Sequence, residues 1–145
     1  MLDLSNNKFS GRIPIHLERH SKFVAAPNNG ELVFDEIEIE MKRHVYTLSY
    51  LWDGNIILDL SCNNLIGEIP TSIGSMSHLR LLNLSSNQLE GKIPASLGGI
   101  STLEQLDLAN NNLSGSIPEE LSKLYGLSIL DVSSNNLCSR IPIGT

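Results

Sequence analysis

The sequence lacks several features that mark other classes of protein. It contains no apolar run of about 18 residues, so it predicts no membrane-spanning helix. It has no basic segment followed by an apolar stretch at its start, so it predicts no signal peptide. Its net charge is −6, with acidic and basic residues interspersed. This balance gives no reason to expect a nucleic acid or an anionic membrane surface as a partner.

The sequence does contain a repeat with a period of 24 residues. The stretch that starts at Leu79, LRLLNLSSNQLEGKIPASLGGI, recurs from Leu103 as LEQLDLANNNLSGSIPEELSKL, and related stretches precede and follow these two. The matched columns are Leu60, Leu84, Leu108 and Val132; Asn63, Asn87, Asn111 and Asn135; and Ile-Pro at 69/70, 93/94, 117/118 and 141/142. Self-similarity at this period predicts an α/β repeat fold, a leucine-rich-repeat solenoid with parallel strands on its concave face.

The spacing within the repeat has a physical meaning. Leucines two positions apart, such as Leu82 and Leu84, point to one side of a short strand, and stacked coils bury them against one another. The asparagine column turns inward where each strand ends, because an amide offers both donors and acceptors to backbone groups there. The glycine of each repeat allows a tight bend, and the proline stops that side of the coil from continuing as helix.

The period fails between the first coil and the remaining four. We expect residues 1–23 to form a partial repeat, 24–55 a non-repeat island insert, and 56–145 four repeats. In the insert, EIEIEM at 36–41 alternates charged and apolar residues, which predicts a half-buried strand with its glutamates facing water or a partner. An irregular insertion on a rigid scaffold often carries recognition, and Tyr is enriched at interface hot spots. The partner-binding candidates are Glu36, Glu38, Glu40, Lys42, Tyr46 and Tyr50.

Beside the inward leucines, the concave face presents a row of polar residues. These are Asp59, Asn83, Asp107 and Asp131. They belong to the repeat pattern, so we interpret the row as structural and expect no metal site and no cofactor. No residue pattern indicates a catalytic nucleophile with its base, so the chain is not expected to be an enzyme.

Two kinds of side chain suggest chemical modification. The N-glycosylation sequons Asn83-Leu84-Ser85 and Asn112-Leu113-Ser114 are present, and Asn112, beyond the strand, is the better candidate. The two cysteines, Cys62 and Cys138, lie three coils apart and therefore beyond the reach of a disulfide. We expect both to be free thiols, buried or half-buried.

The motif LxxLxLxxNxLSGxIPxxLGxL resembles the plant-specific class of extracellular leucine-rich repeats. An insert followed by four coils and IPIGT is similar to the C-terminal part of a plant receptor-like protein, a cell-surface receptor without a kinase domain. In that family the island often carries a Lys and a Tyr with five residues between them, associated with co-receptor contact. Lys42 fits the Lys position, whereas Leu48 occupies the Tyr position, between Tyr46 and Tyr50.

The resemblance implies a non-enzymatic recognition module on the extracellular side of the plasma membrane, in defence or developmental signalling. Its implied partners are a protein or peptide ligand and a co-receptor kinase. Because the chain opens within a repeat and has no terminal caps, we expect a fragment of a longer, membrane-anchored protein. The alternatives are a receptor kinase ectodomain with an island, a soluble inhibitor of cell-wall-degrading enzymes similar to polygalacturonase inhibitors, or a truncated product without independent function.

Overall fold

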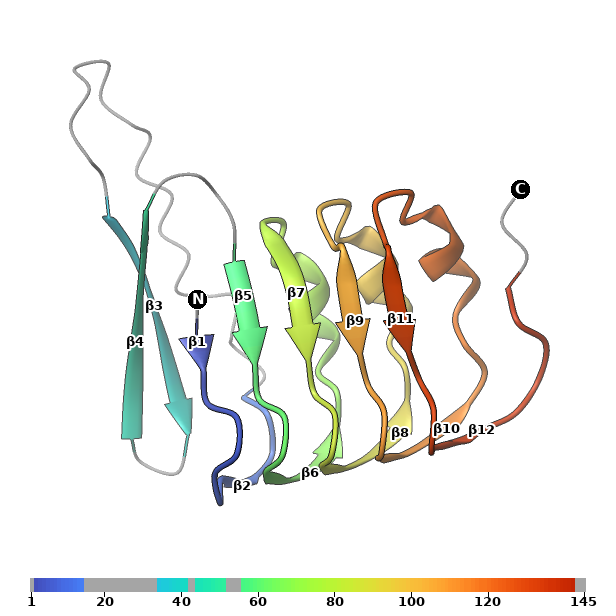
Figure 1. Cartoon of the computed structure of the whole chain (residues 1–145), viewed down its shortest axis with the longest axis horizontal. Helices are drawn as coiled ribbons and strands as arrows, with labels where there is room; N and C mark the ends of the chain where they lie inside the picture. Colours follow the sequence, from blue (N-terminus) through green and yellow to red (C-terminus); the bar gives the residue numbers. More distant parts are fainter. Residues whose placement is uncertain (1, 15–33, 42–43, 52–55, 143–145) are drawn as a thin grey trace, which may run out of the picture.

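The computed structural model describes residues 2–14, 34–41, 44–51 and 56–142, and it contains a solenoid whose coils stack in register (Figure 1). One parallel sheet has the order β1-β5-β7-β9-β11. Its strands are β1 (Leu2–Asp3), β5 (Ile56–Asp59), β7 (Leu79–Asn83), β9 (Gln105–Asp107) and β11 (Ile129–Asp131). This first sheet is the predicted row of parallel strands.

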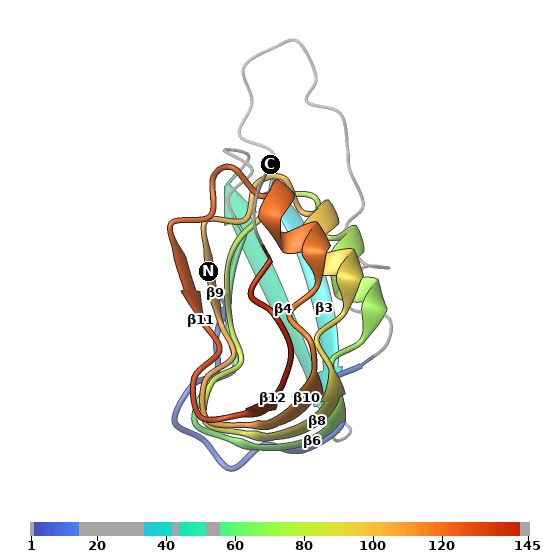
Figure 2. The same cartoon turned by 90° about the vertical axis from the view of Figure 1, so that its right-hand side faces the viewer.

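A second parallel sheet forms the adjacent side of the coil. The sequence pattern did not predict this sheet. It has the order β12-β10-β8-β6-β2. Its strands are β2 (Ser10–Gly11), β6 (Asn64–Glu68), β8 (Gln88–Lys92), β10 (Asn112–Gly115) and β12 (Asn136–Leu137). Figure 2 looks along the stack and shows the two sheets meeting at a corner of the coil.

The third side of the coil is a layer of short helical turns. They are the 3₁₀ helices η2 (Thr71–Ser75), η3 (Ala95–Gly99) and η4 (Glu119–Lys123). Each begins directly after the proline of the Ile-Pro pair, which has extended backbone angles. Proline therefore ends the preceding segment and fixes the start of the turn, and the helical part of this α/β repeat is 3₁₀ in the described residues.

Close packing between these helical turns requires glycine at one position. An added Cβ on Gly98 would lie 2.5 Å from the Cβ and the carbonyl oxygen of Glu120 in the next coil. The equivalent Gly74 meets Ser96 at the same distance. By contrast, a Cβ on Gly99 would meet only the carbonyl oxygen of Gly74, at 3.9 Å. The repeat glycine in this layer is thus a packing requirement.

The first coil stacks directly on the second, although the insert separates them in sequence. Leu2 and Asp3 pair with Leu58 and Asp59, and the Leu4 N–H donates to the Asp59 carbonyl at 2.9 Å. The same bond joins the later coils, as in Leu60 to Asn83. The insert therefore leaves the stack without breaking its register. The exact boundaries at 23/24 and 55/56 stay a prediction, because 15–33 and 52–55 lie outside the described residues.

Within the insert, two strands form an antiparallel hairpin. They are β3 (Phe34–Met41) and β4 (His44–Leu51), and they make a two-stranded sheet of their own. The sequence analysis predicted a strand at 36–41, whereas the strand at 44–51 was not predicted.

The core is a column of aliphatic side chains along the axis of the stack. Leu82, Leu84, Leu106 and Leu108 are fully buried, as the 24-residue period predicts. The last coil differs: Leu130, which is equivalent to the buried Leu106, is 41% exposed. Burial of each coil thus depends on the presence of a neighbouring coil on both sides.

The asparagine column forms a buried ladder of hydrogen bonds between coils. The Nδ2 atom of Asn111 lies 3.0 Å from the Leu84 carbonyl oxygen of the preceding coil and 3.2 Å from two carbonyls of its own coil. Its Oδ1 accepts from the Leu89 N–H at 2.9 Å, in the second sheet of the preceding coil. Asn63, Asn87 and Asn135 repeat this arrangement. One side chain per coil therefore joins both sheets to the coil before it.

The cysteines correct one expectation. Both Cys62 and Cys138 are free and exposed, not buried or half-buried. Cys62 has φ of 53°, in the same left-handed column as Asn6, Ser86, Asn110 and Ser134. This bend carries the chain from one sheet to the other and turns its side chain outward. In the last coil, Ser139 stands where earlier coils have a glycine of positive φ and itself has φ of 105°.

Replacing one rung of the ladder tests its contribution to stability. Asn111→Ala leaves carbonyl and N–H groups in the interior without their partner, so we expect it to lower the free energy of unfolding by about 1–3 kcal/mol. Asn7→Ala is the matched control, because exposed Asn7 contacts only two carbonyls of its own coil. Its cost should be about 0.5 kcal/mol or less. Chemical denaturation measures both, and equal losses would contradict a ladder that works between coils.

Adding one methyl group tests the helical layer. Gly98→Ala forces the new Cβ against the backbone of the next coil, and we expect a loss of about 1–3 kcal/mol from overpacking. Gly99→Ala has room and negative φ, so it should leave stability unchanged or raise it by about 0.4–1 kcal/mol. Thermal unfolding of the two variants compares them directly; a Gly98→Ala protein as stable as Gly99→Ala would refute the packing requirement.

Candidate functional site

The outward face of the first sheet carries the predicted polar row, one residue per coil. Asp59, Asn83 and Asp107 are each half-exposed and stand between buried leucines, whereas half-exposed Asp131 lies beside Leu130, which is 41% exposed. The strand pairing puts them side by side, and Asp3 joins them as the partner of Asp59. The sequence analysis missed Asp3, although the LDLS motif at the start of the chain repeats the LDLS of 58–61.

Each side chain of the row also accepts a hydrogen bond from the backbone of its own coil. The Oδ1 atoms of Asp59, Asp107 and Asp131 accept the backbone N–H two residues further on, at 2.9–3.0 Å. The Asn83 Oδ1 accepts both the N–H and the hydroxyl of Ser85, at 3.1 and 2.7 Å. These hydrogen bonds give the side chains a structural role within their own coils.

Asn83 divides the acidic row. The Asn83 amide donates a hydrogen bond to the Asp59 Oδ2 at 3.2 Å. At this point of the row, neighbouring coils are therefore joined by a hydrogen bond. At the two ends of the row, hydrogen bonds stabilise the charged carboxylates: the Ser133 hydroxyl, and then its backbone N–H, lower the pKa of Asp131, and Ser5 lowers the pKa of Asp3 in the same way. Asp3 and Asp131 are thus negatively charged at neutral pH.

A second row, which the sequence analysis did not identify, runs beside the acidic one. It consists of Ile57, Leu81, Gln105 and Ile129. The first three are half-exposed and Ile129 is 50% exposed. At its edge, the Arg80 guanidinium lies 2.8 Å from the Glu104 carboxylate. The face therefore offers apolar contacts and acceptor oxygens together, a combination suited to binding a peptide or protein surface.

The hairpin divides the partner-binding candidates of the insert. In the register of β3 and β4, Glu36 and Glu38 pair with Ser49 and Thr47, whereas Ile39 pairs with Tyr46. Tyr50 pairs with Asp35, so neither tyrosine pairs with one of the three glutamates. Lys42 lies outside the described residues. The role of these six residues in binding stays a prediction.

The two sequons lie in different sheets. Asn83 belongs to β7 of the first sheet and has the contacts given above, whereas Asn112 is exposed in β10 of the second sheet. Their use as glycan acceptors also stays a prediction.

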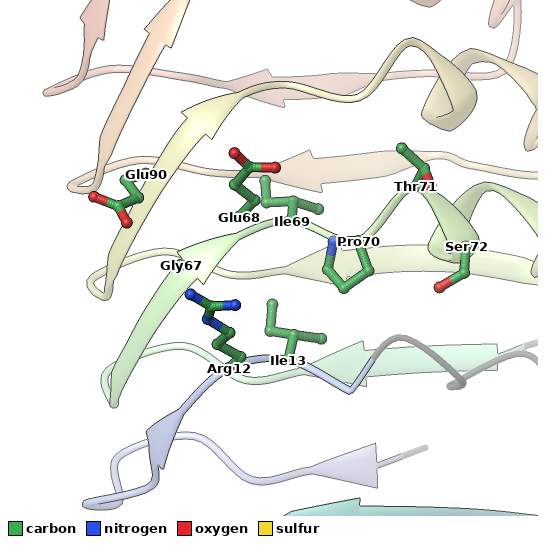
Figure 3. A pocket seen from close by; sticks show the side chains of 9 residues that line it. All are labelled: Arg12, Ile13, Gly67, Glu68, Ile69, Pro70, Thr71, Ser72 and Glu90. Carbon is green, nitrogen blue, oxygen red and sulfur yellow. The ribbon is translucent and has the colours of Figure 1, made fainter.

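The opposite side of the molecule has a hollow of about 620 Å³, which Figure 3 shows from close by. Its lining includes Arg12, Glu68 and Ser72. The Ser72 hydroxyl is buried and has no hydrogen-bond partner among the described residues. One coil later, the equivalent Ser96 donates to the Thr71 carbonyl. The repeat gives residue 15 the same place relative to Ser72, and residue 15 lies outside the described part of the chain, so we assign no site to this hollow.

Neither a metal centre nor a membrane helix is found in the part of the chain that the structure covers. No group of three or more His, Cys, Asp or Glu side chains among the described residues could hold a metal ion. No helix in these same ranges is long and apolar enough to cross a bilayer.

Comparison with known proteins identifies the repeat. Two family models, both described as leucine rich repeat, match residues 57–113 and 1–19, together more than half of the chain. No functionally curated protein matches it.

Several solved structures are similar over nearly the whole chain. A chain of the Arabidopsis receptor kinase HAESA in complex with the peptide hormone IDA and the co-receptor SERK1 is 34% identical over 97% of this chain, with a TM-score of 0.71. A TDR receptor is 29% identical over 97%, with a TM-score of 0.72. The BIR2 ectodomain from Arabidopsis thaliana is 44% identical over 59%, with a TM-score of 0.58.

The relatives are longer than this chain, which spans 18% of the HAESA chain, 19% of the TDR receptor and 45% of the BIR2 ectodomain. The family models and the similarity to these structures agree on the repeat type. The chain belongs to the leucine-rich repeat family, and its repeats are of the type found in plant receptor ectodomains.

Proposed function

We propose that this chain is part of the extracellular recognition region of a plant cell-surface receptor in defence or developmental signalling. In this proposal the chain performs no catalysis. It binds a protein or peptide ligand and contacts a co-receptor, and the whole receptor is a glycoprotein anchored in the plasma membrane. The observation that carries the proposal is the outward face of the first sheet, where a row of aspartates with Asn83 among them crosses five coils and a mainly apolar row runs beside it across four.

A rigid face with repeated spacing suits an extended ligand. The strands of neighbouring coils are about 4.8 Å apart, so polar and apolar side chains recur at a fixed interval along this face. Because Asp131 and its equivalents are already held by hydrogen bonds within their coils, little side-chain entropy is lost on binding. HAESA, which is similar over nearly the whole chain, has been solved with a peptide hormone and a co-receptor.

The hairpin supplies the proposed contact with the co-receptor. Three glutamates at alternate positions of β3, Glu36, Glu38 and Glu40, give one face of the ribbon a single sign of charge. Such a face accelerates association with a basic surface more than it changes the stability of the complex. Tyr46 and Tyr50, which pair with other residues of β3, are proposed to anchor the ribbon or to add contact area.

The polygalacturonase-inhibitor alternative is not favoured. The structures that are similar over 97% of the chain, HAESA and the TDR receptor, are receptors. Whether the parent carries a kinase domain depends on sequence beyond this chain and is not part of the proposal.

A charge reversal of the hairpin tests the co-receptor contact. The triple variant Glu36→Lys, Glu38→Lys and Glu40→Lys should reduce the association rate with an immobilised SERK1 ectodomain at least several-fold, with a smaller change in the dissociation rate. Surface plasmon resonance at two salt concentrations measures both rates, and the difference between variant and wild type should shrink at high salt.

The matched control reverses three exposed glutamates elsewhere, Glu68, Glu90 and Glu119. It changes the net charge by the same amount on other faces of the molecule, so it should preserve most of the association rate. An equal loss of association rate in both triple variants would mean that overall charge causes the effect and that the hairpin has no special part in it. Unchanged binding in the hairpin variant would remove the hairpin from the contact.

A further inference from the structure

We propose that Asn112 is the N-glycan acceptor of this chain, that Asn83 is not, and that the glycan covers the outward face of the second sheet. The inference rests on the proposed extracellular location, since glycans are attached in the secretory pathway. It goes beyond that location and beyond the preference for Asn112 that the sequence indicates, because it gives the structural reason for that preference and sets aside one face of the solenoid as unavailable to partners.

Asn112 has the surroundings that a bulky, hydrated modification requires. It is the first residue of β10, and its side chain is exposed and makes no hydrogen bond among the described residues. The equivalent residues of the other coils are exposed and polar: Asn64, Gln88 and Asn136. Along the strand, Asn112 is followed by Leu113, which is fully buried in the core. A sugar at Asn112 therefore extends over a polar surface and displaces no packed side chain.

Asn83 has the opposite surroundings. Both functional atoms of its amide are used, since the nitrogen donates to Asp59 and the oxygen accepts two hydrogen bonds from Ser85. Ser85, the hydroxyl residue of this sequon, is held in the same turn. In addition, Asn83 is half-buried between Asp59 and Asp107 on the neighbouring strands, only about 4.8 Å away on each side. A glycan there would disturb the turn and cover the acidic row.

The two positions define which faces remain open. In Figure 2 the second sheet forms one side of the coil and the first sheet the adjacent side, joined by a bend. A flexible glycan on β10 of the second sheet hinders the approach of a protein to β8, β10 and β12. The first sheet, where the acidic and apolar rows lie, stays free. The glycan thus directs partners to the face that carries the proposed function.

The test uses the 145-residue chain secreted from cultured human cells behind a generic signal peptide. Peptide mapping by mass spectrometry, with and without PNGase F, reports the occupancy of each asparagine directly in the wild type. We expect one glycan, at Asn112. Asn112→Gln and Ser114→Ala should each remove the mass shift, whereas Asn83→Gln and the column control Asn64→Gln should retain it.

The outcomes separate this inference from the proposed function. An unoccupied Asn112 in the secreted chain, or a glycan at Asn83, overturns the assignment. The claim about the face is tested by enzymatic removal of the glycan. The glycosylated and PNGase F-treated chains should bind the SERK1 ectodomain with equal affinity, and a several-fold change on deglycosylation would contradict a glycan that lies away from the partner. Absence of binding in both forms would reject the co-receptor proposal and leave the glycan assignment intact.

Discussion

The buried asparagine ladder is the interaction on which the rest of this structure depends. Each amide spans two coils: it donates to a carbonyl at the end of the preceding first-sheet strand and accepts from an N–H of the preceding second-sheet strand, as Asn87 does with Leu60 and Leu65. The backbone groups that it satisfies lie where the chain turns from one sheet to the other and has no ladder partner. Without such an amide the turn would bury unpaired polar groups, at a cost of about 1–3 kcal/mol for each. The two sheets are therefore held in a common register.

That register determines the surface that can act in recognition. Because every coil turns at the same point, the residues that alternate with the buried leucines line up into rows, and single-residue differences between coils become features of a continuous face. Asn83 among aspartates and Gln105 among aliphatic residues are such differences. The scaffold itself is generic, so specificity depends on these positions and on whatever departs from the repeat.

The insert illustrates how such a scaffold accepts variation. Leu4 and Leu60 are separated by more than two repeats in sequence, yet their coils are joined by the same backbone hydrogen bonds as coils one period apart. The hydrogen bonds of Asn63 to the first coil, with Leu4 and Phe9, are also preserved. The insert adds a hairpin without changing how the coils stack. Stacking depends on contacts between neighbouring coils and does not depend on the length of chain that connects them.

The sequence by itself determined the repeat, the inward columns of leucine, the inward asparagines and the strand at 36–41, because period and alternation record which positions face the core. Tertiary structure alone decided the rest. The second sheet escapes notice because Asn64–Glu68 and its equivalents are short and pair only with other coils. Local pattern could not specify that the first coil stacks directly on the second, or that the β3–β4 register sets the glutamates apart from Tyr46 and Tyr50. It preferred Asn112 to Asn83 as a glycan acceptor, but it could not show the hydrogen bonds that hold Asn83 or that Cys62 is exposed, since these depend on how the coils stack.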